Sequence, residues 1–269
     1  MTSHARNRRT VLITGASSGI GADLARVFAR EGHDLVLVAR SRDRLDALAN
    51  ELRKTHAATV QVVPADLSVP GAAGAIHELV ARETSAVDVL VNNAGFGMRG
   101  AFVDLDAARQ LKMIQVNLVA LTELTRLFLP EMTRRGAGHV LNVASTAAFQ
   151  PGPLMAAYCA TKAYVLSFSE ALALELKGSG VTVTCVAPGA TDTRFGETAG
   201  VTSTRLFRAG TMSSSAVAEA AYAATTRGKA LAVPGCRNRL LSASVRFLPV
   251  AIAARIAGRF LEDAPGGTR

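Results

Sequence analysis

Short apolar runs alternate with longer amphipathic stretches along most of the chain. The short runs are nearly continuous in Val, Leu, Ile and Ala, which is typical of strands buried on both faces of a parallel sheet. Six runs predict strands and one more predicts a short seventh: Thr10–Thr14, Asp34–Ala39, Thr59–Val63, Val87–Val91, His139–Ala144, Val181–Ala187 and Ala230–Val233.

The stretches between these strands have the spacing of helices. They are Ile20–Glu31, Arg42–Lys54, Ala72–Glu83, Arg109–Arg135 and Met155–Lys177. Strands alternating with helices predict βαβ units. We therefore expect an α/β fold, with one doubly wound parallel sheet of about seven strands flanked by helices. No linker or repeat divides residues 10–237, which we interpret as a single domain.

Two segments lie outside or at the rim of this domain. Residues 1–9 form a basic N-terminal extension without the apolar core of a secretory signal, and we exclude it from the predicted fold. Residues 189–215 place Gly, Thr and Ser around isolated apolar residues, which predicts a mobile flap beside the substrate.

Residues 238–269 are predicted to form a C-terminal amphipathic helix and a tail. Apolar residues recur every four positions there, beside arginines: Leu248, Ile252, Ile256 and Phe260, with Arg246, Arg255 and Arg259. Such a helix can pack on the body or on a partner subunit, cover a substrate channel as a lid, or touch a membrane surface. The first of these is favoured, and membrane contact is the least favoured.

Composition limits the class of protein. Hydrophobic residues make up 49% of the chain and charged residues 19%, which argues against disorder. Three cysteines without C-x-x-C spacing predict no disulfide framework and no metal site, and they fit a reducing, cytoplasmic location. The net charge of +9 is scattered, so we expect no nucleic-acid partner, and attraction for anionic cofactors is the better explanation.

Ligands of open parallel sheets gather at the carboxyl ends of the strands. The residues that follow the predicted strands are unusual in chemistry: Gly15–Gly19, Arg40, Asp66-Leu67, Asn92–Gly95, Ser145 and Pro188-Gly189. The candidate chemistry therefore lies along one edge of the predicted sheet.

A glycine-rich loop joins the first strand to the first helix. Its glycines allow backbone N–H groups to approach a phosphate at the helix N-terminus. The pattern is G-x-x-x-G-x-G and not the general G-x-G-x-x-G, and a turn without a ligand is the alternative. Its position after the first strand favours dinucleotide binding by Gly15, Ser17, Ser18, Gly19, Ile20 and Gly21.

The second strand ends at Arg40, where an acid would select a ribose hydroxyl and an arginine would pair with a 2'-phosphate. Asp34 lies at the other end of that strand. Arg40, helped by Ser17, Ser41 or Arg44, therefore favours NADP(H) over NAD(H), although an exposed arginine at a helix start is the plain alternative. Asp66 either bonds the adenine amino group or caps its own turn.

Tyr158 and Lys162 are four residues apart on a predicted helix and share one face, where an ammonium group would lower the pKa of the phenol. Ser145 ends the fifth strand and can donate a hydrogen bond to a substrate oxygen. Asn117 lies in an apolar segment, where its amide needs a partner. Taken singly, each has a structural explanation as a surface pair, a cap or a bridge.

Together these residues resemble the short-chain dehydrogenase/reductase family in its branch of ordinary length. The resemblance spans residues 10–233 and rests on motifs in the family's order: Gly15-x-x-x-Gly19-x-Gly21, Asn92-Asn93-Ala94-Gly95, Asn117, Ser145, Tyr158-x-x-x-Lys162 and Pro188-Gly189. It implies a Rossmann-type fold, an enzyme acting on CH–OH or C=O groups, and a homodimer or homotetramer.

The resemblance also implies roles for residues. Tyr158 would be the general acid/base, Ser145 would polarise the carbonyl, Lys162 would lower the tyrosine pKa and bind the nicotinamide ribose, and Asn117 would hold a relay water. Contacts to the cofactor would come from Leu67, Asn93, Ala94, Gly95, Pro188, Gly189 and Thr193, with Thr191 as a substitute for Thr193.

Apolar residues after Ser145 and in the flap predict a hydrophobic substrate cleft: Phe149, Pro151, Pro153, Leu154, Met155, Phe195, Val201, Leu206, Phe207 and Met212. We expect a carbonyl reductase that uses NADP(H) on a hydrophobic ketone, 3-oxoacyl group or steroid-like alcohol. An NAD-dependent alcohol dehydrogenase and a non-catalytic dinucleotide-binding sensor are the alternatives. The joint presence of Tyr158, Lys162, Ser145 and Asn117 speaks against the sensor.

Overall fold

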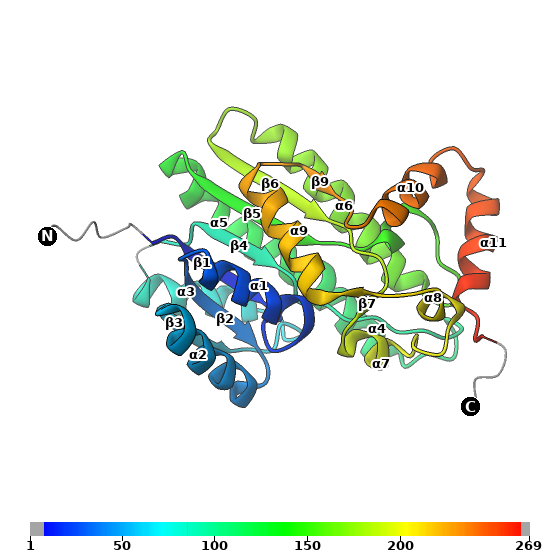
Figure 1. Cartoon of the computed structure of the whole chain (residues 1–269), viewed down its shortest axis with the longest axis horizontal. Helices are drawn as coiled ribbons and strands as arrows, with labels where there is room; N and C mark the ends of the chain where they lie inside the picture. Colours follow the sequence, from blue (N-terminus) through cyan, green and yellow to red (C-terminus); the bar gives the residue numbers. More distant parts are fainter. Residues whose placement is uncertain (1–7, 85, 265–269) are drawn as a thin grey trace, which may run out of the picture.

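A parallel sheet of seven strands forms the centre of the computed structural model, which describes residues 8–84 and 86–264. The strands follow the order β3-β2-β1-β4-β5-β6-β9, and the order reverses between β1 and β4 (Figure 1). Their bounds are β1 Thr10–Thr14, β2 Asp34–Ala39, β3 Val60–Pro64, β4 Val89–Asn92, β5 Gly138–Val143, β6 Val181–Val186 and β9 Leu231–Ala232. The predicted fold class and all seven strands are confirmed, with ends that differ by at most two residues.

Helices cover both faces of the sheet, as its apolar strands require. One face carries α1 (Gly19–Arg30), α2 (Arg42–His56) and α9 (Ser214–Thr226). The other carries α3 (Ala72–Glu83), α5 (Leu121–Arg135) and α6 (Ala156–Glu175). The strand β1 shows why both faces are needed, since Val11 and Ile13 belong to the core under α1 whereas Leu12 belongs to the core under α3 and α5.

Three helical regions differ from the predictions. The helix predicted over Arg109–Arg135 is divided into α4 (Ala107–Ile114), a π-helical turn η1 (Gln115–Ala120) and α5. The helix α9 was not predicted, although Ser213 caps it by accepting a hydrogen bond from Ala216 N and its interior is rich in alanine. Residues 189–215 hold the short elements β7 (Thr191–Asp192), α7 (Arg194–Ala199), α8 (Arg205–Arg208) and β8 (Met212–Ser213).

The C-terminal stretch predicted as one amphipathic helix forms two. They are α10 (Cys236–Val245) and α11 (Val250–Leu261), and Pro249 stands at the N-cap of α11. Proline fixes its own backbone and disfavours a helical conformation in the residue before it, so one helix cannot run through this point. The tail over residues 265–269 lies outside the described residues.

The N-terminal extension contributes to the fold, contrary to its exclusion in the sequence analysis. Arg8 Nη1 donates to the backbone oxygen of Ala57 at 2.6 Å and forms an ion pair with Asp34 at 3.6 Å. The backbone oxygen of Arg9 accepts from Asp34 N at 3.0 Å. The described chain is therefore attached to the sheet from Arg8 onward, and residues 1–7 of the predicted extension lie outside the described residues.

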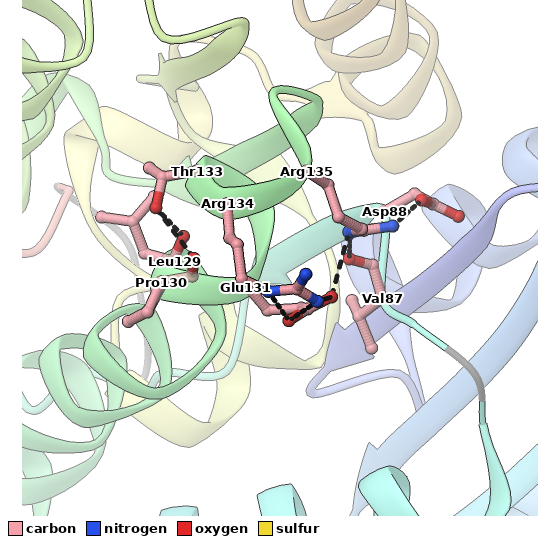
Figure 2. Close-up of polar contacts among 8 residues, drawn as sticks. All are labelled: Val87, Asp88, Leu129, Pro130, Glu131, Thr133, Arg134 and Arg135. Carbon is pink, nitrogen blue, oxygen red and sulfur yellow. Dashed lines mark hydrogen bonds and ion pairs between the residues drawn. The ribbon is translucent and has the colours of Figure 1, made fainter.

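Charged side chains form an ion pair at the amino edge of the sheet, where the strands begin. Arg135 at the end of α5 pairs with Asp88 at 2.8 Å and donates to the backbone oxygen of Val87, also at 2.8 Å (Figure 2). The second carboxylate oxygen of Asp88 accepts from Thr10 N at 2.8 Å. These bonds connect α5, the start of β4 and the start of β1.

Among the described residues, no helix has the length and apolarity needed to cross a lipid bilayer.

Candidate active site

A cleft of about 1370 Å³ opens at the carboxyl edge of the sheet, beside the point between β1 and β4 where the strand order reverses. Ligands of doubly wound sheets bind at such a point. The structure brings all the cofactor-binding residues named from the sequence to the lining of this one cleft, together with Ser145, Tyr158 and Lys162. Asn117 is buried and is not among the residues that line the cleft.

The glycine-rich loop needs its glycines for two different reasons. Gly15 and Gly19 have positive φ angles of 67° and 54°, a conformation that side chains disfavour. A Cβ atom on Gly21 would lie 2.4 Å from Gly15 O, so this glycine allows the first turn of α1 to pack against the loop. The N-terminal turn of α1 has no acidic residue, and Ser18 gives it no side-chain cap. Its amide groups thus border the cleft where Ser17, Ser18 and Gly19 line it.

The loop is fixed to the segment after β4 by a partly buried cluster of polar groups. Asn93 Nδ2 donates to Thr14 O at 2.9 Å, and Thr14 Oγ1 accepts from the backbone N of Asn93 and of Ala94, both at 3.0 Å. Gly15 packs on this segment so closely that a Cβ atom would lie 2.9 Å from the Cα of Ala94. Asn93 and Ala94 therefore shape the loop as well as lining the cleft.

Positive charge gathers at the end of the cleft below β2 and β3. Arg40 and Arg44 are exposed and line it, and Lys112 on α4 is near enough to act on Asp66, although the sequence analysis did not single it out. Arg109 on α4 also lines the cleft, but on the flap side, where it donates to Thr198 O at 3.1 Å. Burial alone would raise the pKa of Asp66, but bonds from Ser68 and the charges of Arg40 and Lys112 lower it overall. Asp66 Oδ1 accepts from Ser68 N at 2.9 Å, which shows the local capping role considered in the sequence analysis.

Three side chains meet at the other end of the cleft. The hydroxyl of Ser145 lies near enough to the phenol of Tyr158 to lower its pKa, and Lys162 Nζ lies 5.9 Å from the centre of the Tyr158 ring. Lys162 is buried and donates to Val143 O at 2.7 Å. The helical spacing of Tyr158 and Lys162 thus places both over the end of β5, beside Ser145.

The electrostatics of this trio differ from the prediction. Burial raises the pKa of Tyr158 above its ordinary value, and the bond from Ser145 only partly opposes it. Burial also lowers the pKa of Lys162 to about 8, so the lysine is still mostly charged at pH 7 and loses its charge above about pH 8. The pKa of Tyr158 is thus raised and not lowered as the sequence analysis expected, because burial disfavours the charged phenolate.

Asn117 serves the backbone beside the cleft. Its Oδ1 accepts from Phe96 N at 3.0 Å, and its Nδ2 donates to Phe96 O at 2.9 Å and to Thr161 Oγ1 at 3.2 Å. The π-helical turn η1 carries this residue, and such turns occur frequently at functional sites. A Cβ atom on Gly95 would lie 3.0 Å from Asn117 Oδ1 and 3.6 Å from Lys162 Nζ, so the three residues pack together.

The two candidate threonines after β6 have different surroundings. Thr191 Oγ1 donates to Gly189 O at 2.9 Å, so its hydroxyl is engaged locally. Thr193 packs against the glycine-rich loop, where a Cβ atom on Gly19 would lie 2.9 Å from its Cγ2. Asn238, which the sequence analysis missed, packs over Gly189 and bonds Pro234 O at 3.0 Å.

The predicted apolar wall is partly wrong. Phe149, Pro151, Pro153 and Leu154 do not line the cleft, although their neighbours Gln150 and Gly152 do. The other predicted wall residues do line it: Met155, Phe195, Val201, Leu206, Phe207 and Met212. The C-terminal helices add a second apolar wall, which fits the lid among the three roles considered for them: Leu241, Val245, Leu248, Ile256, Phe260 and Leu261.

The C-terminal wall is attached to the flap by polar contacts. Arg99 pairs with Asp263 at 2.8 Å and donates to Leu261 O at 2.8 Å and to Gly200 O at 2.9 Å. Arg205 N also donates to Glu262 O at 3.1 Å. Residues around positions 99, 200 and 262 are far apart in the sequence, so single-segment patterns gave no signal for this arrangement. The part of the chain that the structure describes has no group of three or more His, Cys, Asp or Glu residues arranged to hold a metal.

Comparison with known proteins identifies the family of the chain. The family profile described as short chain dehydrogenase matches residues 9–202. A short-chain dehydrogenase from Sphingobium yanoikuyae, solved in complex with NADPH, is 36% identical, with a TM-score of 0.81 over 97% of this chain and 98% of that one. The bulky-bulky ketone specific alcohol dehydrogenase from Comamonas testosteroni is 33% identical, with a TM-score of 0.76 over 98% of both chains.

A relative found by comparing sequences is matched over a smaller share of its length than the two solved structures are. The ketoacyl reductase HetN of Nostoc sp. is 35% identical over 181 residues, which are 67% of this chain and 63% of that protein. The chain therefore matches less than two thirds of the length of that relative. The likeness to the two solved structures extends further and includes the C-terminal helices.

Proposed function

Because the chain belongs to the short-chain dehydrogenase/reductase family, we propose that it transfers hydride between NADP(H) and the carbonyl or secondary alcohol of a bulky apolar substrate. The observation that carries this proposal is the meeting of Ser145, Tyr158 and Lys162 at one end of a cleft whose other end is glycine-rich and basic. A single extended ligand in that cleft reaches both ends.

The residues present fit a nicotinamide dinucleotide. The glycine-rich loop provides a closely packed cradle at the N-terminus of α1, where a Cβ atom on Gly21 would collide with Gly15 O. Arg40 and Arg44 supply positive charge at the position that distinguishes a 2'-phosphate from a hydroxyl. We propose that Ser17 and Ser41 assist them, that Asp66 and Leu67 border the adenine, and that Thr193 contacts the nicotinamide end.

When bound, the nicotinamide would give or take the hydride. The chain's own residues handle the proton. Tyr158 holds it on the phenolic oxygen, in keeping with its raised pKa, and donates it to the carbonyl oxygen as negative charge develops there. Ser145 donates a second hydrogen bond to the same oxygen. Lys162, fixed by Val143 O, is positioned to stabilise the phenolate that remains.

The walls of the cleft favour a bulky substrate. Apolar side chains approach the Tyr158 end from two sides, from the flap and from the C-terminal helices. Phe195 lies close to the acid/base itself, with its ring centre 5.4 Å from that of Tyr158. The name of the Comamonas relative describes a preference for ketones that are bulky on both sides. We propose ketones with two large apolar substituents ahead of 3-oxoacyl esters.

The first experiment is a fluorescence titration of the purified protein with NADPH and NADH, followed by NADPH oxidation with a panel of carbonyl compounds. The panel contains a diaryl ketone, a keto-steroid, a 3-oxoacyl ester and a small ketone such as acetone. We expect tight NADPH binding, and the highest kcat/KM on the diaryl ketone or the keto-steroid. Binding without turnover of any compound would support the dinucleotide sensor, and failure to bind either nucleotide would contradict the proposal.

The other proposals concern the setting of the enzyme. An NAD-dependent alcohol dehydrogenase is the second candidate, and Arg40 argues against it. A homodimer or homotetramer and a cytoplasmic location remain proposals. Leu111 on α4 and Leu174 near the end of α6 are exposed apolar residues available for subunit contact.

A further inference from the structure

The helices α10 and α11, with the turn between them, present an exposed apolar surface. We call the outer side of residues 236–261 the C-terminal face. Phe247 is 87% exposed, Leu240 72% and Val250 67%, and Ile252 is also exposed. None of these four lines the cleft. Exposure of so many large apolar side chains in one place indicates a surface that meets a partner.

The same surface carries positive charge without any negative charge. Residues 236–261 contain five arginines and no Asp or Glu: Arg237, Arg239, Arg246, Arg255 and Arg259. All five are exposed, and the ion pairs found among the described residues include none of them. Arg237 lies on the cleft side, where it donates to Ala209 O at 3.0 Å, so the other four carry the charge of the C-terminal face. On α11, Ile252, Ile256 and Phe260 form a strip next to Arg255 and Arg259. An apolar strip beside a basic strip is typical of a helix that lies in a membrane interface.

The shape of the C-terminal face also favours a lipid surface. The chain turns between the two helices through Phe247-Leu248-Pro249-Val250, so consecutive apolar residues stand at the tip. Figure 1 shows α10 and α11 at one end of the molecule, with this turn at its outer edge. A protruding apolar tip can enter the headgroup region of a bilayer, whereas a protein partner would need a matching pocket.

A second copy of the chain is a poorer occupant of this face. A two-fold contact places the same surface of both subunits against itself. It would bring Arg239, Arg246, Arg255 and Arg259 of one copy towards the same four of the other, without an acid in residues 236–261 to compensate. Like charges facing each other weaken an interface. Charge complementarity therefore points to an anionic partner.

We infer that the C-terminal face binds the surface of an anionic lipid bilayer, with the Phe247–Val250 turn inserted among the headgroups and the arginines on the lipid phosphates. Leu241, Leu248, Ile256 and Phe260 are partly exposed on this face and also line the cleft. The cleft thus opens beside the bound bilayer. This step rests on the proposed function. Because the C-terminal face and the cleft share residues, an apolar ketone dissolved in the bilayer would have a direct route to Tyr158.

The test is co-sedimentation of the full chain with vesicles, read as protein bound and independent of turnover. We expect binding to vesicles that contain phosphatidylglycerol, little binding to pure phosphatidylcholine, and release at high salt. The double variant Phe247→Asp/Val250→Asp should bind at least tenfold more weakly, since it removes the apolar tip. Arg255→Gln/Arg259→Gln should bind about 30-fold more weakly, on the usual contribution of two basic residues near an anionic surface.

Matched controls separate this face from general surface chemistry. Val103→Asp/Leu111→Asp makes the same charge change at two equally exposed apolar positions elsewhere, and Arg227→Gln/Lys229→Gln removes the same charge at the far end of α9. Both control variants should bind as the unchanged chain does. The inference is overturned if phosphatidylglycerol vesicles do not bind the chain, or if the controls weaken binding as much as the face variants. It is also overturned if sedimentation velocity shows a dimer that Phe247→Asp/Val250→Asp dissociates.

Discussion

The two edges of the central sheet use polar residues in opposite ways. At the amino edge, charged groups satisfy one another, as where Asp88 accepts from Arg135 and from Thr10 N. At the carboxyl edge, functional side chains are held by backbone groups and turn their chemistry to the cleft, as where Lys162 is bound by Val143 O. Paired polar groups stabilise a fold, whereas a buried amine with one neutral partner costs stability. The paired charges at the amino edge thus stabilise the fold, whereas the buried Lys162 at the carboxyl edge reduces stability and is the residue that the proposed function uses.

The largest expected effect is that of Tyr158→Phe at the carboxyl edge. Removal of the phenolic oxygen should lower kcat by about 10³-fold, in the range typical of a lost general acid. NADPH affinity, measured by fluorescence titration, should change less than about threefold, since the ring remains in place. Tyr164→Phe is the matched control, because Tyr164 lies on the same helix outside the cleft and bonds Thr122. Loss of cofactor binding together with turnover would mean that Tyr158 has a structural role.

Lys162→Met tests whether the carboxyl edge reduces stability for the sake of function. Below pH 8 the lysine is charged in both the folded and the unfolded chain, so the full cost of its burial is present. Its removal should raise the free energy of unfolding at pH 7 by about 2 kcal/mol. The pKa shift corresponds to a destabilisation of about 3 kcal/mol that the variant avoids, and the variant loses about 1 kcal/mol of stabilisation with the hydrogen bond to Val143 O. Activity should be lost.

The extra stability of Lys162→Met over the original chain should decrease as the pH rises. Between pH 8 and the ordinary lysine pKa of 10.5, the folded chain has released the proton and the unfolded chain still binds it. The original chain is therefore stabilised relative to the variant across this window. Urea unfolding at pH 7 and pH 10 measures the change, with the exposed Lys177→Met as the control. A stability difference that is the same at both pH values would contradict the buried, low-pKa lysine.

Much of the carboxyl edge was predictable because its signals are local. Each parallel strand is a short apolar run, and its carboxyl end is marked by the next polar or glycine residue, such as Arg40 or Ser145. The fold rule that ligands gather at that edge then united residues from six segments. Tyr158 and Lys162 needed only the helical period to be placed on one face.

The missed features depend on contacts between distant segments. The direction of the Tyr158 pKa follows from how deeply the fold buries it, which the spacing of four residues does not show. The apolar wall made by Leu241 and Ile256 appears only when the C-terminal helices fold back over the flap. The π-helical turn at Asn117 is likewise invisible in the apolar pattern, because it changes the hydrogen bonding and not the residue types.

Arg40→Ala should have a smaller effect. This variant separates the role of the basic end of the cleft from that of the Tyr158 end. A charge-assisted bond to a 2'-phosphate contributes roughly 1.5 to 3 kcal/mol, so NADPH affinity should fall about 10- to 100-fold. NADH affinity should be nearly unchanged. The control is Arg42→Ala, two residues away, exposed and not part of the cleft lining. Equal losses for NADPH and NADH would place the phosphate contact elsewhere.

The smallest effect tests the amino edge, where two neighbouring arginines both pair with Glu131 but only Arg135 also reaches Asp88 and Val87 (Figure 2). Arg135 is 24% exposed and connects α5 with Asp88 and Val87, whereas Arg134 is 74% exposed and pairs with Glu131 on its own helix. Arg135→Met should lower the free energy of unfolding by about 1 to 2 kcal/mol, because it leaves Asp88 without its cation. Arg134→Met should cost at most about 0.5 kcal/mol, as exposed helical pairs usually do. Both variants should keep kcat and NADPH affinity in activity assays, since neither residue borders the cleft. A loss of activity per folded molecule in Arg135→Met would break the division between the two edges.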